Sequence, residues 1–192
     1  MRNNREDSEN QTYLEAGLVK KAKKKTSLEK ELLTSEKPKL SKPDVFILRS
    51  NHFKNNERLP KSYFCDKIVP NYPSLIWEGR VVNTKSFAIA FYGIDEFSDE
   101  PYVYFILYNI PKTVFRLDTF NFQEVGRFGL NSDGLTNYIV PCEGKSKYVF
   151  SLCALTVENL LTVSKKEEID FKEFNRICSL YNTHTSILIA KG

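Results

Sequence analysis

Two stretches of almost unbroken apolar character constrain the fold of this 192-residue chain more than any other feature. They are Lys85–Tyr92 (KSFAIAFY) and Lys147–Leu155 (KYVFSLCAL), and both are the length of a strand rather than of a helix. Runs of this kind suit strands that are covered on both faces of a sheet, although periodicity alone leaves a buried helix open. Asp44–Leu48 and Tyr102–Asn109 have the same character. The sequence also holds ten Tyr and fourteen Phe against eight Gly, which favours strands because aromatic rings suit a pleated surface.

Helical signals appear mainly late in the chain. Thr156–Leu161 could form one turn of helix, and Lys165–Ser179 has an amphipathic pattern. The final apolar segment, Thr185–Ala190, reads as a closing strand or the end of a helix. Together with the earlier runs, these signals predict a mainly β domain with flanking helices over residues 44–192.

Residues 1–43 differ from the rest of the chain. They are polar and poor in aromatic residues, so they cannot bury enough apolar area to offset the entropy of ordering. They carry eleven basic and seven acidic side chains, an excess that equals the net charge of +4 of the whole chain. We expect a disordered or partly helical tail. Its basic run, residues 20–25 (KKAKKK), could contact nucleic acid or an anionic membrane, but it lacks interleaved aromatic residues for base stacking, which favours a solvated segment.

The four cysteines show no Cys-x-x-Cys spacing, which argues against a zinc site or a thioredoxin-like redox motif. The N-terminal residues lack the apolar stretch of a signal peptide, and no apolar run approaches the roughly 18 residues of a membrane span. The sequence alone does not decide whether the cysteines form disulfides. The simplest expectation is a cytoplasmic protein with reduced cysteines.

Motifs for catalysis or for metal and cofactor binding are lacking. His52 and His184 lie in no recognisable motif, so surface or hydrogen-bonded roles are favoured over that of a catalytic base. There is no glycine-rich phosphate loop or calcium loop. The acidic cluster of residues 95–100 lacks the ordered spacing of calcium ligands and is expected to be a solvated loop. We therefore expect no metal and no cofactor.

Six short motifs occur in order between Leu48 and Leu155. They are residues 50–53 (SNHF) with 57–60 (ERLP), 72–77 (YPSLIW), 84–89 (TKSFAI), 108–111 (YNIP), 137–142 (NYIVPC) and 147–150 (KYVF). In this order and spacing they resemble the bacterial-type phosphatidylethanolamine-binding proteins, relatives of the Raf kinase inhibitor proteins. The resemblance implies a β-sandwich with one large antiparallel sheet, a smaller sheet and a C-terminal helix.

The resemblance also implies an anion pocket at one end of the sandwich, able to take a phosphate or a phospholipid headgroup. That pocket normally uses an Asp-Pro-Asp-x-Pro loop, a His on the following strand and a Gly-x-His-Arg turn. Here Gly93 stands at the first Asp and only Asp95 remains, while Tyr104 stands where the His belongs. The resemblance then carries over to seven candidate ligand-binding residues: Asp95, Tyr104, Tyr138, Pro141, Ser146, Lys147 and Tyr148.

These departures alter the expected chemistry. Ser146 and Lys147 replace His-Arg, and a lysine is a point charge where an arginine would be a bidentate donor. Losing the His removes a group that titrates near neutral pH. We therefore expect weak anion binding with altered selectivity, or a vestigial pocket.

The resemblance implies a non-enzymatic binding or regulatory protein that acts on a protein partner, such as a kinase or a protease. Two alternatives stay open. One is an enzyme on a phosphorylated or acyl substrate, with Asp95 and Tyr104 in acid and base roles. The other gives residues 20–25 the main role, through nucleic acid or a membrane surface. The sequence fixes neither the ligand nor the partner nor the oligomeric state.

Overall fold

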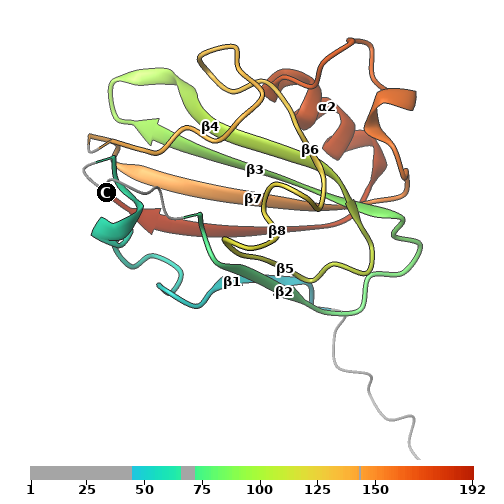
Figure 1. Ribbon diagram of the computed structural model, residues 1–192, viewed down its shortest axis with the longest axis horizontal. Coiled ribbons are helices and arrows are strands. Elements are labelled where there is room, and N and C mark those ends of the chain that lie inside the picture. Colours follow the sequence, from blue (N-terminus) through green and yellow to red (C-terminus); the bar gives the residue numbers. More distant parts are fainter. Residues whose placement is uncertain (1–44, 66–71, 143) are drawn as a thin grey trace, which may run out of the picture. The chain divides into compact units, whose positions relative to one another are not determined.

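The computed structural model describes residues 45–65, 72–142 and 144–192, with the side chain of Asp99 left out. In this part of the chain, eight strands form two antiparallel sheets (Figure 1). The smaller sheet has the order β1-β2-β5, formed by β1 (Ile47–Ser50), β2 (Leu75–Glu78) and β5 (Arg116–Leu117). The larger sheet has the order β6-β4-β3-β7-β8, formed by β6 (Arg127–Phe128), β4 (Ser98–Pro111), β3 (Ser86–Asp95), β7 (Lys147–Leu155) and β8 (Asn182–Lys191). The predicted mainly β fold with two sheets is confirmed.

The large sheet is covered on both faces, as its continuous apolar strands predict. Along β3, Phe87, Ile89 and Phe91 belong to a core shared with the small sheet. Ala88 and Ala90 between them face a second core, which they share with the helix α2 (Phe171–Tyr181). Because successive side chains of a strand point to opposite faces, the domain has three layers: small sheet, large sheet and helix.

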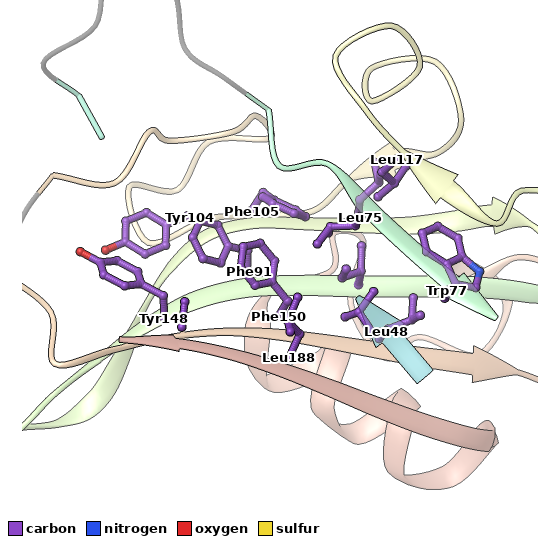
Figure 2. Packing of buried hydrophobic residues seen from close by; sticks show 14 of the residues in the cluster. Leu48, Leu75, Trp77, Phe91, Tyr104, Phe105, Leu117, Tyr148, Phe150 and Leu188 are labelled. Carbon is purple, nitrogen blue, oxygen red and sulfur yellow. The ribbon is translucent and has the colours of Figure 1, made fainter. Parts of the chain in front are cut away.

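Aromatic rings fill the core between the sheets. Phe91 at its centre stacks on Phe150, with ring centroids 4.1 Å apart, and also packs on Tyr104 at 4.8 Å. Figure 2 shows this row of rings running toward Tyr104 and Tyr148 at one end and toward Trp77 at the other. The high aromatic content of the sequence therefore lies mostly in one packed layer.

The helix starts later than the amphipathic pattern over Lys165–Ser179 predicts. Asp170 caps its N-terminus, since its carboxylate accepts a hydrogen bond from the backbone N–H of Glu173. Glu173 is itself buried and pairs with Arg176 at 2.6 Å. The predicted turn near residues 156–161 is a short 3-10 helix, η2 (Leu160–Thr162), and the segment Thr185–Ala190 is part of strand β8.

The outer edge of β8 is covered by residues 55–59, a segment we call the edge segment. The N–H of Asn56 donates to the Ile189 carbonyl at 2.8 Å, and the N–H of Lys191 donates to the Glu57 carbonyl at 2.8 Å. The N–H of Leu59 then donates to the Lys191 carbonyl at 2.9 Å. The edge segment thus satisfies backbone groups that an edge strand otherwise leaves unpaired.

The four cysteines form two disulfides, so the expectation of reduced cysteines is wrong. Cys65 pairs with Cys142, and Cys153 on β7 pairs with Cys178 on α2. The partners are 77 and 25 residues apart in sequence, but folding brings their Cα atoms to 5.1 and 6.0 Å. Both separations fit disulfide geometry, which sequence spacing does not reveal.

No helix in the described ranges is both long and apolar enough to span a bilayer. The predicted tail, residues 1–43, lies outside the described residues.

Candidate functional site

One end of the large sheet collects the segments that the sequence singles out. Gly93 near the end of β3 lies opposite Tyr148 at the start of β7, and Tyr148 in turn lies opposite Ala190 near the end of β8. The chain end, the turn before β7 and the short helix η1 (Lys61–Tyr63) lie at this same end (Figure 1). Antiparallel pairing therefore brings residues that are far apart in sequence to one rim.

A cavity of about 490 Å³ opens at this rim. The described residues that line it come from the segment after β1, from the turn before β7 and from the chain end: Arg58, Leu59, Pro60, Lys61, Phe64, Gly144, Lys145, Tyr148 and Gly192. Three of these described residues have cationic side chains, and none is Asp or Glu. The lining is therefore electropositive, with apolar side chains beneath the charges.

The two walls of the cavity touch at its base. Phe64 from the first wall packs edge-on against Tyr148 from the second, with ring centroids 5.6 Å apart. The hydroxyl of Tyr148 donates to the Cys142 carbonyl at 3.2 Å. These contacts fix the apolar floor while the cationic side chains stand at the mouth.

Lys145 is held over the rim by two neighbours. Its Nζ lies 3.2 Å from the Asp95 carboxylate and 5.8 Å from the ring centroid of Tyr102. The Lys145 and Asp95 side chains are 27% and 30% exposed, so solvent screens the pair and its stabilisation is modest. Asp95 therefore orients Lys145 and offsets part of its charge, without itself lining the cavity.

Tyr104 is buried behind this rim and is packed against Gly93. A Cβ atom on Gly93 would lie 3.0 Å from the Tyr104 hydroxyl and 2.7 Å from Cγ of Lys145. Burial raises the pKa of Tyr104 well above its ordinary value, and the neighbouring Tyr148 hydroxyl raises it further. Tyr104 therefore stays protonated at neutral pH, and it leaves no room for an aspartate at position 93.

Ser146 and Lys147 take structural and solvent-facing positions. The Ser146 hydroxyl donates to the Ile94 carbonyl at 3.0 Å, which ties the turn to β3. Lys147 is exposed and does not line the cavity, because it points to the opposite face of β7 from Tyr148.

Tyr138 and Pro141 belong to the packing behind the cavity. The Tyr138 ring lies 5.4 Å from Tyr72 and 5.6 Å from Phe105, and burial raises its pKa above the ordinary value. Its buried hydroxyl has no hydrogen-bond partner among the described residues. Pro141 is buried and its carbonyl accepts a hydrogen bond from the backbone N–H of Cys65 at 2.9 Å.

The structure therefore brings only part of the predicted set to the cavity. Tyr148 lines it, and Asp95 reaches it through Lys145, whereas the other five residues support the surroundings or face away. Sequence reasoning missed Arg58, Lys61 and Lys145. Arg58 lies within the ERLP motif, and Lys145 lies in the turn that resembles Gly-x-His-Arg. Both motifs therefore mark this region of the sequence, but the motif at the turn points to Ser146 and Lys147 rather than to Lys145.

A sequence profile described as phosphatidylethanolamine-binding protein matches residues 49–181, which is most of the domain. The chain belongs to the phosphatidylethanolamine-binding protein family. One relative in this family, a UPF0098 protein of Aquifex aeolicus, is 34% identical over 123 residues, covering 58% of this chain and 68% of that protein.

Solved structures of family homologues share the fold. The putative homolog CT736 of Chlamydia trachomatis superposes with a TM-score of 0.66 at 22% identity, covering 78% of this chain and 97% of that one. YbcL of Escherichia coli, described as a new member of the mammalian family, gives a TM-score of 0.63 at 22% identity, covering 76% and 96%. The resemblance inferred from the short motifs is thereby confirmed, and so is the fold.

Proposed function

We propose that this protein is a non-enzymatic binding protein of the phosphatidylethanolamine-binding family whose cavity takes a small anionic group, a phosphate ester being the fitting class. The observation that carries the proposal is the charge of the lining. Arg58, Lys61 and Lys145 stand around an apolar floor, and no Asp or Glu side chain occurs among the described residues of the lining. A volume of about 490 Å³ lies within the range of small-molecule sites.

The three cations offer complementary contacts to such an anion. Arg58 has a planar guanidinium that can bind two oxygens at once, whereas Lys61 and Lys145 act as point charges. The anion must compete with Asp95 for Lys145, so we expect binding in the millimolar to high micromolar range. A free phosphate and a phospholipid headgroup share this chemistry, and the measurement below separates them.

Isothermal titration with inorganic phosphate and with phosphoethanolamine tests the proposal. We expect saturable binding that weakens with salt, and a loss of about five-fold or more in affinity for Lys145→Met, as for removal of a charged hydrogen-bond donor. Lys147→Met is the matched control, because it removes the same charge two residues away without touching the cavity. Absence of binding at millimolar concentration, or equal losses in both variants, would refute the site. Binding of phosphoethanolamine well above that of phosphate would favour the headgroup.

We further propose that the domain acts by contacting a protein, with a kinase or a protease as the partner class that the family resemblance suggests. Phe97 at the tip of the β3–β4 hairpin is 96% exposed. Exposed aromatic side chains are frequent anchors of interfaces. Inhibition of a partner enzyme should therefore weaken in Phe97→Ala without loss of fold.

The structure offers no support for acid and base roles of Asp95 and Tyr104. Asp95 pairs with Lys145, and the protonated Tyr104 hydroxyl is buried away from the cavity lining. We expect no turnover of nitrophenyl phosphate or nitrophenyl acetate.

A cytoplasmic location and a role for residues 20–25 stay predictions. Deletion of residues 1–43 should abolish any salt-dependent binding to DNA or anionic vesicles.

A further inference from the structure

The two walls of the cavity are linked by a covalent bond. Cys65 follows Phe64 of the first wall directly, and Cys142 lies two residues before Gly144 of the second. Their disulfide joins segments 77 residues apart in sequence. Besides this bond, the walls are joined by the Phe64–Tyr148 ring contact and by the hydrogen bond from the Cys65 N–H to the Pro141 carbonyl. They are also joined through β8, because the N–H of Leu59 donates to the Lys191 carbonyl and β8 pairs with β7.

The two disulfides differ in their exposure to solvent. Cys65 and Cys142 are both exposed, whereas Cys153 and Cys178 lie in the core between β7 and α2. Reduction requires a thiolate to reach one sulfur of the bond, so access governs which disulfide reacts. A soluble thiol should therefore reduce Cys65–Cys142 while Cys153–Cys178 stays oxidised.

We propose that the Cys65–Cys142 disulfide is a thiol-exchange site that sets the anion affinity of the cavity. The proposal rests on the anion site described above. A thiolate of a small-molecule or protein dithiol attacks one sulfur, forming a mixed disulfide and releasing the other cysteine as a thiolate. The second thiol of the reagent then displaces the remaining cysteine, so that the reagent is oxidised to its disulfide and both cysteines become thiols.

The charge of the cavity explains why this bond controls affinity. Arg58 and Lys61 lie on one wall and Lys145 on the other, so these like charges repel each other when no anion is present. The Asp95 carboxylate offsets part of the Lys145 charge and so reduces this repulsion. The disulfide holds the cations at a fixed separation against that repulsion. After reduction, an anion must also restrain the two walls, and this ordering lowers its affinity.

The test is a phosphate titration of the whole protein before and after treatment with dithiothreitol under native conditions. We expect two thiols to appear, with alkylation and mass spectrometry mapping them to Cys65 and Cys142. The dissociation constant for phosphate should rise about five-fold or more, as expected when ordering is added to binding, and reoxidation should restore it. Circular dichroism of the reduced protein, recorded below its melting temperature, should match that of the oxidised protein, because the fold is expected to be kept.

The Cys65→Ser/Cys142→Ser variant is the control, since its phosphate affinity should equal that of the reduced protein and should not respond to dithiothreitol. Unchanged affinity in a protein whose exposed pair is fully reduced would overturn the switch and leave the anion site intact. Reduction of Cys153–Cys178 first would also overturn it. Failure of the oxidised protein to bind phosphate would instead remove the anion site, and the switch with it.

Discussion

Replacing Gly93 with alanine should destabilise the domain because the new methyl group has no room. Its Cβ would lie 2.7 Å from Cγ of Lys145 and 3.0 Å from the Tyr104 hydroxyl, both closer than ordinary contacts. Overpacking of this kind costs about 1–3 kcal/mol. Gly93 does not have a positive φ, so the alanine also gains about 0.4–1 kcal/mol from a less flexible unfolded chain. The net loss in the free energy of unfolding is then roughly 1–2 kcal/mol.

Urea unfolding followed by the fluorescence of the single tryptophan, buried Trp77, measures this loss. The melting temperature should fall by ~2–8 °C for a domain of this size. Rescue identifies the cause. Because the Tyr104 ring is fixed by Phe91 and Tyr148, Tyr104→Phe should relieve the alanine by at least about 0.5 kcal/mol in a double-mutant cycle.

Lys145→Met is the matched comparison in the same cycle, because it keeps Cγ and should give no relief. A neutral or stabilising Gly93→Ala would refute the close packing. The close packing would also be refuted if Tyr104→Phe restored no more of the stability lost in Gly93→Ala than Lys145→Met does. A Gly93→Ala variant that loses stability for reasons outside this contact would show additive, uncoupled effects with Tyr104→Phe.

Two further predictions concern the core and the helix. Arg176 hydrogen-bonds to the Glu173 carboxylate and lowers its pKa from 4.5 to about 2, so this group stabilises the fold above pH 4.5 and loses that contribution as the pH falls toward 2. Acid unfolding curves should flatten over this interval in Glu173→Gln, and an unchanged slope would contradict the assignment. Phe150→Ala removes the ring stacked on Phe91 and should cost about 3–5 kcal/mol in urea unfolding. The exposed Phe97→Ala should stay within about 0.5 kcal/mol of the parent, and comparable losses in the two would contradict the packing.

The sequence predicts the layers of this fold well because they depend on apolar patterning. Lys147–Leu155 is a strand over the predicted residues, and the run at Lys85–Tyr92 lies within β3 apart from its first residue. Helix α2 begins at Phe171 rather than Lys165 because a capping aspartate fixes its start. Boundaries of this kind depend on single hydrogen bonds that a periodic pattern does not contain.

The candidate site is harder to predict because it depends on which way a few side chains point. Lys145 lies in the turn before β7 and Lys147 is the first residue of that strand. Only the pleat of β7 decides that Lys147 faces away from the cavity. The cysteine pairing was equally hidden, since it joins residues 77 apart. The apolar pattern of the sequence thus locates the rim of the sandwich. Which side chains face the cavity at that rim depends on strand register, which the pattern does not give.

The edge segment along β8 affects how readily this protein could aggregate. Arg58 belongs to the cavity wall, and the backbone around it from Asn56 to Leu59 hydrogen-bonds along β8. Peeling this segment away would expose a bare ladder of N–H and carbonyl groups, which is a template for intermolecular strand addition. A ligand bound to Arg58 would hold this segment on β8 and so protect the protein from self-association. The protein with an empty cavity would then be the form that aggregates more readily.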